Sequence, residues 1–248
     1  MIRRIPTPLP IDEECRQVCC HFDENAFHAA LPDLLSLTLP TELSRAVPKR
    51  KAEFIAGRYC AREALALLAN SPFATGTETI QRDARVGIGA NREPLWPGGV
   101  VGSITHSHGY ASAVVARRDQ VRAVGVDTEK WIEPDRAENI KQQILTRQEC
   151  HAEQQLLFDS PLHYLTLVFS AKESLFKCLF PLVNTFFDFH AAAILLGRPG
   201  PLSNGEFRFK LLTDLNDEFR AGYSGAGSYC ADASSGHTAI IIKAQPGK

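Results

Sequence analysis

The sequence predicts an α+β protein in which strands and helices are grouped and do not alternate one by one. Two long helical segments are each followed by runs that have strand character. These runs cover residues 100–105, 110–116, 121–127, 191–197, 207–212 and 237–244. A parallel α/β sheet would require a helix after nearly every strand. With 248 residues, 44% of them hydrophobic, the chain can bury the core of one large or two small domains.

The first half begins with residues 1–40, which we expect to be irregular with short strands because prolines interrupt them. The pattern becomes helical from Thr41, and Pro48 breaks or starts a helix. In 49–69 the apolar residues Phe54, Leu65 and Leu68 recur at helical spacing. Six cations lie in 45–62 against a single acid, Glu53. They are Arg45, Lys49, Arg50, Lys51, Arg58 and Arg62. Such a helix face either binds an anion or is simply a solvated basic surface.

A connection rich in Gly, Pro and Asn spans 70–98 and leads into a hairpin over 100–116, with its turn at His106–Gly109. The polar residues Arg117–Gln120 mark the expected boundary between two subdomains. We therefore assign residues 1–118 to the first subdomain and residues 119–248 to the second.

The second half contains helices over much of 134–180. Thr146 and Glu149 fit a capping box, so a helix is expected to start there and run through 151–158. A second helix should follow Pro161 and end at Pro181. Residues 221–236 are rich in Gly and Ser, and we expect them to form a flexible loop.

Net charge and cysteine content limit the class of protein. The net charge is −1 and the pI about 6.7, so a broad field that attracts nucleic acid or an anionic membrane is not expected. The N-terminus has two arginines without an apolar run behind them, and no segment is apolar enough to span a membrane. Seven cysteines without an export signal indicate reduced thiols and a cytoplasmic protein.

Asp127 and Glu129 lie two residues apart at the end of a strand, so their side chains point to the same face. Two carboxylates on one face repel each other unless a cation lies between them or solvent separates them. The pair therefore indicates either a cation site or a solvated end of a strand.

Glu173 and Lys177 are one helical turn apart, which is also the spacing of a surface ion pair. Ser170 and Glu173 fit a capping box as well. The surrounding segment is very apolar, however, and charged side chains beside a buried helix are usually paired or functional. Three carboxylates, Asp127, Glu129 and Glu173, would form an all-oxygen site suited to Mg²⁺ with phosphate as a further ligand. His106 would then bind phosphate or serve as a hydrogen-bonded turn residue.

Four segments in this order resemble the 4′-phosphopantetheinyl transferases of the Sfp/EntD type. The segments are EFIAGRYCAREAL (53–65), REPLWPGGVVGSITHSHGY (92–110), VGVDTEK (124–130) and FSAKESLFKCLFP (169–181). The resemblance implies two similar α/β subdomains related by a pseudo-twofold axis, with the active site between them. It implies a monomer that binds coenzyme A, with the 3′-phosphate end on the first subdomain and the magnesium site and carrier protein on the second.

The resemblance also implies roles for single residues. Asp127, Glu129 and Glu173 would bind Mg²⁺, and His106 and Lys177 would contact the phosphates of coenzyme A. Thr105 would add a hydroxyl contact. Three arginines are expected near the 3′-phosphate and adenine, namely Arg50, Arg58 and Arg92. Asp127, Glu173, Lys177 and His106 form the expected catalytic group, with Glu173 or a metal-bound water as the base.

The implied reaction is that of a holo-acyl-carrier-protein synthase. A serine of an apo acyl, peptidyl or aryl carrier domain attacks coenzyme A, takes the 4′-phosphopantetheine group and releases 3′,5′-ADP. Carriers of nonribosomal peptide, polyketide or fatty-acid synthases are the possible partners, and an enterobactin-like siderophore pathway is favoured. The alternatives are a Mg²⁺-dependent nuclease and a non-enzymatic coenzyme A-binding module. A nuclease would need a wider basic surface, and a binding module would not need three carboxylates.

Overall fold

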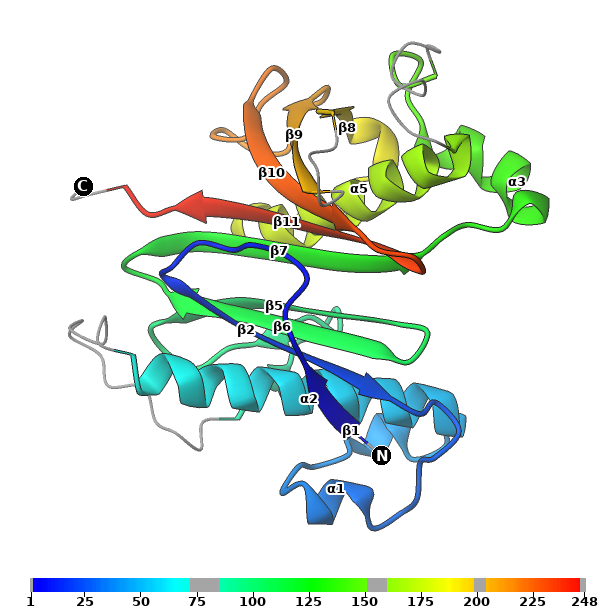
Figure 1. Ribbon diagram of the computed structural model, residues 1–248. Helices are drawn as coiled ribbons and strands as arrows, with labels where there is room; N and C mark the ends of the chain where they lie inside the picture. The colour runs from blue at the N-terminus through cyan, green and yellow to red at the C-terminus, as the bar shows by residue number, and fades with distance from the viewer. Residues whose placement is uncertain (1, 72–84, 151–159, 199–203, 246–248) are drawn as a thin grey trace. The chain divides into compact units, whose positions relative to one another are not determined.

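The structure is a computed structural model that describes residues 2–71, 85–150, 160–198 and 204–245 (Figure 1). The chain divides into two compact units. Unit 1 comprises Met1–Thr7, Ile11–Val124 and Ile242–Lys248, and unit 2 comprises Pro8–Pro10 and Gly125–Ile241. Each unit contains an antiparallel sheet and one long helix, which confirms the predicted α+β class. Within the described ranges, no helix has the length and apolar character needed to cross a bilayer.

Unit 1 is built on a four-stranded antiparallel sheet with the order β1-β2-β6-β5. Its strands are β1 (Ile2–Ile5), β2 (Cys15–Phe22), β5 (Val100–Ser107) and β6 (Tyr110–Arg117). The short helices α1 (Leu31–Leu34) and η1 (Thr41–Leu43) precede the long helix α2 (Pro48–Ala69), and β3 (Gly87–Ile88) pairs with β4 (Pro94–Leu95). Residues 1–40 thus contain two strands of the sheet, of which β2 is longer than the short strands expected there.

Helix α2 begins at Pro48, whose fixed φ suits the first helical position. Figure 1 shows α2 along one face of the sheet. Its buried side is made of small residues, among them Ala52, Ala56 and Ala64, which pack against Val18 and Val115 of the strands. Small side chains allow the helix to approach the sheet closely, so the positions of its polar side chains are well defined relative to β5.

The β5–β6 hairpin turns at His108 and Gly109, which both have positive φ (45° and 77°). Positive φ at both central residues is the geometry of a type I′ turn, the turn that matches the twist of two paired strands. Ser107 pairs with Tyr110 across the turn. The hairpin expected over 100–116 is therefore confirmed, and His106 is the penultimate residue of β5.

Unit 2 contains a five-stranded sheet with the order β7-β11-β10-β9-β8. Its strands are β7 (Val121–Lys130), β8 (Ala192–Leu196), β9 (Asn204–Leu211), β10 (Ser224–Ala231) and β11 (Ser235–Lys243). Its helices are α3 (Pro134–Ile144), the long α5 (Pro161–Val183) and the 3-10 turn η2 (Phe189–Ala191). The strands expected near 191–197, 207–212 and 237–244 are all present.

The prediction of a flexible loop over 221–236 is wrong for most of that segment, because β10 pairs with β9 and β11 there. The glycines that suggested a loop make room for aromatic rings on β9. A Cβ at Gly225 would lie 2.6 Å from the Phe209 ring, and one at Gly227 would lie 2.3 Å from the Phe207 ring. Glycine is thus used in this strand for close packing across the sheet.

Helix α5 begins after Ser160, whose hydroxyl accepts a hydrogen bond from Leu162 N (3.2 Å). The predicted end at Pro181 is wrong, since the helix continues to Val183 and ends at Asn184 in the left-handed conformation (φ 48°). Pro181 removes one N–H donor from the last helical turn but does not end the helix there. Because Ser170 lies inside the helix and bonds to Thr238 (2.9 Å), the capping-box interpretation of Ser170 and Glu173 is also wrong.

A buried ion pair joins α5 to the segment after α3. Lys172 Nζ lies 2.7 Å from Glu149 Oε2, and both side chains are almost completely buried. Glu149 also accepts from Thr146 N (2.6 Å) and Ile194 N (2.7 Å). Glu149 N donates to the Thr146 hydroxyl (3.4 Å), so the predicted capping box is confirmed at these two residues; the helix predicted over 151–158 lies outside the described residues.

We expect the Lys172→Met variant to lose about 3–5 kcal/mol of unfolding free energy, because Glu149 would remain buried without its cation. Urea denaturation of the full chain measures this loss. The matched control is Lys130→Met, which removes an exposed ion pair with Glu133 (3.5 Å) and should cost less than about 1 kcal/mol. Equal losses in the two variants would contradict the structural role of the buried pair.

Candidate functional site

Asp127, in β7 of unit 2, is the centre of the first group of predicted site residues. Its carboxylate is only 3% exposed. Lys177 Nζ, from α5, donates to Asp127 Oδ1 (2.6 Å) and to Val126 O (3.3 Å). A short, charge-assisted bond of this kind fixes both side chains. Lys177 therefore binds a carboxylate on a neighbouring strand, and the simple surface pair with Glu173 is not its main interaction.

Gly125 explains how β7 comes close enough to α5 for this contact. A Cβ at Gly125 would lie 1.9 Å from Ser174 O and 2.7 Å from Cys178 N. Only glycine can occupy this point, because the obstructing atoms belong to the backbone of the helix. The close approach places Asp127, two residues further along the same face of β7, beside the helical turn that carries Glu173 and Lys177.

Glu173 lies next to Asp127 on α5. Burial raises the pKa of the Glu173 carboxyl above its ordinary value, and the negative charge of Asp127 raises it further, while Lys177 partly offsets both effects. Two carboxylates that repel each other in a half-buried place are suited to share a cation. The structure thus brings together three predicted site residues, Asp127, Glu173 and Lys177.

Glu129 is half-buried near the end of β7, on the face predicted for Asp127. Thr128, on the other face, bonds to His237 Nδ1 (3.0 Å), and His237 Nε2 lies 3.2 Å from Asp232. Alternation of side chains along β7 therefore agrees with the prediction. Among residues 2–71, 85–150, 160–198 and 204–245, no three carboxylate, imidazole or thiol groups gather closely enough to hold a metal ion. Asp127 and Glu173 are therefore the two predicted carboxylates that the structure places near each other, and the metal-binding role of Asp127, Glu129 and Glu173 stays a prediction.

His106, in β5 of unit 1, is the centre of the second group. Its Nε2 lies 3.0 Å from Arg50 Nη1 on α2. Glu53, one turn further along α2, lies 3.3 Å from the same Arg50 nitrogen and 3.8 Å from His106 Nδ1. The structure therefore unites Arg50 with His106, although the family resemblance placed them at different ends of coenzyme A.

Arg58 is the next predicted arginine on α2. Its Nη2 donates to Gly87 O of β3 (2.9 Å), and its guanidinium stacks on the Phe54 ring. Burial lowers the pKa of Arg58 to about 10. Within the described residues, its buried Nη1 has no hydrogen-bond partner. Arg92 lies in the turn between β3 and β4 with φ 66°, so Arg58 contacts the hairpin that carries Arg92.

Thr105 is not brought to the His106 side of the sheet. Neighbouring residues of a strand point to opposite faces, and His106 points toward α2. Thr105 is 3% exposed and pairs in register with Ser112, on the face away from α2. Thr105 and His106 thus lie on opposite faces of the unit 1 sheet, and the hydroxyl contact predicted for Thr105 stays a prediction.

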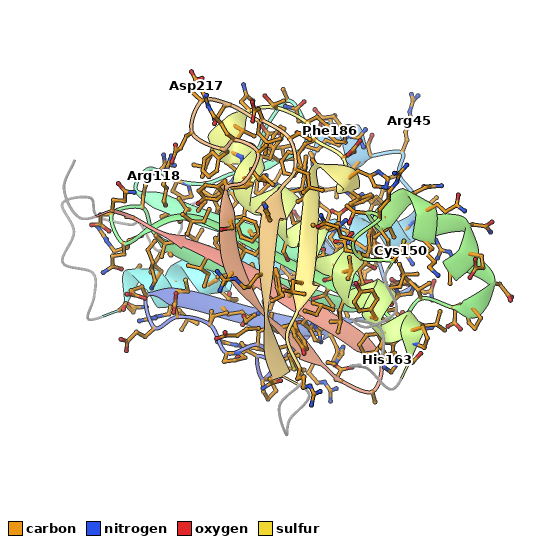
Figure 2. All side chains as sticks on the ribbon, turned by 90° about the horizontal axis from the view of Figure 1, so that it is seen from above. Arg45, Arg118, Cys150, His163, Phe186 and Asp217 are labelled. Carbon is orange, nitrogen blue, oxygen red and sulfur yellow. The ribbon has the colours of Figure 1, made fainter. Side chains whose placement is uncertain are left out.

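The other cations before and along α2 make local contacts. Lys49 pairs with Glu24 (3.0 Å), Lys51 donates to Ser44 O (2.6 Å), and Arg62 donates to Leu35 O. Arg45 is exposed and extends away from the ribbon (Figure 2). Most of these cations bind nearby groups, so the interpretation of this helix face as a solvated basic surface is not supported.

Two residues that make contacts in these groups, Glu53 and Gly125, were not predicted from the sequence. Glu53 was visible only as the single acid among six cations, and nothing in its spacing indicated that it would contact His106. Gly125 stood in a valine-rich strand, and only the distance to α5 reveals its role. Lys172, the residue before Glu173, points into the buried pair with Glu149.

Comparison with known proteins covers both units. The family model described as 4′-phosphopantetheinyl transferase N-terminal domain matches residues 39–116, and the model described as 4′-phosphopantetheinyl transferase superfamily matches residues 123–230. The chain is 35% identical to 4′-phosphopantetheinyl transferase PptT of Mycobacterium tuberculosis, over 78% of this chain and 81% of the relative. It is 32% identical to 4′-phosphopantetheinyl transferase Npt of Nocardia iowensis, over 84% and 85%. It is 39% identical to enterobactin synthase component D of Salmonella typhi, over 63% and 58%.

The close approach at Gly125 is testable. We expect Gly125→Ala to lower the free energy of unfolding by roughly 1–3 kcal/mol, because the added methyl meets backbone atoms that cannot rotate away. Chemical denaturation measures the loss. The matched control is Gly57→Ala in α2, where the nearest atom to the new methyl is a side-chain atom, Ile104 Cγ2 at 2.9 Å, and where alanine gains helix propensity. A Gly125→Ala variant as stable as Gly57→Ala would show that the contact is not tight.

Proposed function

The chain belongs to the 4′-phosphopantetheinyl transferase superfamily, and we propose that the residues around Asp127 and His106 carry out its reaction. That reaction moves the 4′-phosphopantetheine group from coenzyme A to a serine of an apo carrier protein and releases 3′,5′-ADP. The observation that carries the proposal is the group formed by Asp127, Glu173 and Lys177, where two carboxylates and an ammonium lie at the contact between β7 and α5.

Unit 2 is proposed to act at the reacting phosphorus. The serine hydroxyl attacks the β-phosphorus of coenzyme A, and the bond from that phosphorus to the oxygen of 3′,5′-ADP breaks. Negative charge on the phosphoryl oxygens must be stabilised during this exchange. Lys177 supplies a cation at this place, and Asp127 keeps its ammonium in position. Glu173 is our first choice for the base that accepts the serine proton, because it is a carboxylate beside this group.

Asp127, Glu129 and Glu173 would hold Mg²⁺ in this family reaction. The fit rests on the donor chemistry, since carboxylate oxygens are the ligands that Mg²⁺ prefers and the mutual repulsion of Asp127 and Glu173 favours a cation between them. When bound, the ion would neutralise charge on the pyrophosphate. Asp127 would then bind the metal ion and keep its hydrogen bond from Lys177.

Unit 1 is proposed to hold the phosphates of coenzyme A through His106 and Arg50, and its 3′-phosphate end through Arg58 and Arg92. The buried Nη1 of Arg58 has no acceptor among the described residues, so it could donate to a phosphate oxygen only if its surroundings open on binding. Stacking on the Phe54 ring holds the Arg58 guanidinium in a defined plane, so its N–H donors have a fixed direction that suits phosphate binding.

A cavity of about 270 Å³ opens beside Glu173. Its lining combines the charged residues Glu173 and Asp188 with the rings of Phe176, Phe187 and Phe189. Phe186 also lines the cavity and is 78% exposed (Figure 2). The pantetheine arm has methyl groups as well as amides, so an aromatic cavity next to the proposed base is a suitable place for it.

The carrier is proposed to belong to a nonribosomal peptide synthase of siderophore type. This rests on the name of one relative, enterobactin synthase component D. Polyketide and fatty-acid carriers are the other substrates that the family chemistry allows. A cytoplasmic location is supported by the seven cysteines, which are all free thiols.

A magnesium-dependent nuclease is not favoured. The net charge of −1 provides no wide basic surface for a nucleic-acid backbone. The cations of α2 are also tied to local partners such as Glu24 and Glu53. Several phosphate contacts along a strand of nucleic acid would need more cations than this helix leaves available.

We expect the full chain, incubated with coenzyme A, Mg²⁺ and an apo peptidyl carrier protein, to raise the mass of the carrier by one phosphopantetheine group. Intact-protein mass spectrometry measures the shift. Omission of Mg²⁺ with a chelator present should abolish it. If several apo peptidyl and acyl carriers remain unmodified under these conditions, the proposed transfer is wrong.

In the same assay, Asp127→Ala is expected to lower turnover roughly 10³-fold or more, because it removes both the partner of Lys177 and a metal ligand. The matched control is Asp217→Ala, which removes a fully exposed carboxylate that pairs with Arg220 at the surface (Figure 2). This control should turn over like the unaltered protein. Turnover by Asp127→Ala at the rate of Asp217→Ala would exclude Asp127 from the site.

A further inference from the structure

Glu53 has no role in the reaction outlined above, yet it completes a three-residue group in unit 1. Arg50, Glu53 and His106 contact each other, and the Glu53 side chain is only 13% exposed. A carboxylate this close to two groups meant to bind phosphate would repel an incoming anion. Its presence therefore needs a reason, and the hydrogen-bond chemistry of His106 supplies one.

Arg50 determines which nitrogen of His106 carries the proton. A guanidinium can only donate, so His106 Nε2, 3.0 Å from Arg50 Nη1, must accept. The ring is then neutral and carries its proton on Nδ1. Glu53 Oε2 lies 3.8 Å from that nitrogen. Without ligand, the group thus consists of one cation, one anion and a neutral imidazole whose Nδ1–H points to the side of the carboxylate.

Binding of a phosphate to this group changes the protonation state that His106 needs. The oxygens of the phosphate attract the Arg50 guanidinium away from His106, and Nε2 then faces an acceptor. The ring can donate from Nε2 only after it gains a proton there. The resulting imidazolium lies between the phosphate on one side and Glu53 on the other, so both neighbours stabilise its charge.

We propose that Glu53 is a positioning residue that keeps His106 in the Nδ1–H tautomer before coenzyme A binds and stabilises the protonated ring afterwards. Binding of coenzyme A is then accompanied by uptake of a proton from solvent at His106 Nε2. This inference rests on the proposed function, because it takes phosphate of coenzyme A as the anion at His106. It assigns Glu53 to the binding step and to no bond that forms or breaks.

The other charged groups near this end of β5 do not replace Glu53. Lys49 and Glu24 form their own pair (3.0 Å), and Glu24 also accepts from Gly109 N (3.1 Å). His108 Nδ1 lies 3.0 Å from the Ser107 hydroxyl in the turn. On β6, the residue paired with His106 is Ala111, which has no charge. Arg50 and Glu53 are the two charged groups of α2 that contact His106 directly.

Isothermal titration of coenzyme A into the full chain, in two buffers with different ionisation enthalpies at slightly alkaline pH, measures the protons taken up on binding. Protons that coenzyme A itself exchanges are common to all variants, so His106→Asn provides the baseline. The unaltered protein is expected to take up more protons than this baseline, by up to one per ligand. Glu53→Gln is expected to fall to the baseline and to bind coenzyme A about two- to fivefold more weakly.

Two variants separate charge from folding. Glu53→Asp keeps a carboxylate and should retain part of the proton uptake. The matched control, Glu63→Gln, removes a carboxylate from the same helix that pairs with Arg62 (2.9 Å), and should behave like the unaltered protein. Proton uptake by Glu53→Gln equal to that of the unaltered protein would overturn the proposal, as would a baseline value for the unaltered protein.

Failure of the proposed function has a different signature. If the unaltered protein neither binds coenzyme A nor modifies a carrier, the function is wrong. The arrangement of Glu53 is then still tested by nitrogen NMR of the His106 ring in the ligand-free protein. A neutral ring protonated at Nδ1 is expected there, and a ring protonated at Nε2 would overturn the assigned tautomer.

Discussion

The contact between β7 and α5 is the constraint on which the proposed reaction centre depends. Because Gly125 has no side chain, the strand lies against the backbone of the helix at Ser174 and Cys178. That distance allows Lys177 to reach Asp127 at 2.6 Å and places Glu173 in the field of the same carboxylate. A larger residue at position 125 would separate the carboxylates from the ammonium, and the chemistry of the group would be lost with the contact.

The buried pair of Glu149 and Lys172 supports the same helix from another side. Lys172 precedes Glu173 in sequence, and its ammonium also donates to Ile144 O and Phe189 O. Glu149 accepts from the backbone of β8. These bonds hold one turn of α5 among several neighbouring segments. A buried ion pair contributes little net stability compared with an apolar substitute, so its value here lies in fixing the orientation of the turn that carries Glu173.

The two groups of site residues differ in how their charges are balanced. In unit 2, two carboxylates face one ammonium, which leaves an excess of negative charge suited to a metal ion. In unit 1, Arg50 and Glu53 carry opposite charges beside His106, and Arg58 is a half-buried cation stacked on Phe54. This difference agrees with the proposed function, in which unit 2 would take a metal ion and unit 1 would take phosphate.

The sequence by itself determined the α+β class, the family and the positions of most helices and strands, because periodicity and ordered motifs are local properties of the chain. Through the family resemblance it also predicted that Asp127 and Glu173 belong to one site. Only the tertiary structure decided that Arg50 and Glu53 meet His106, that Lys172 is buried with Glu149, and that Thr105 faces away from His106. It also showed that most of the Gly-rich segment expected to be a loop belongs to strand β10. These outcomes depend on distances between segments far apart in sequence, which no local pattern encodes.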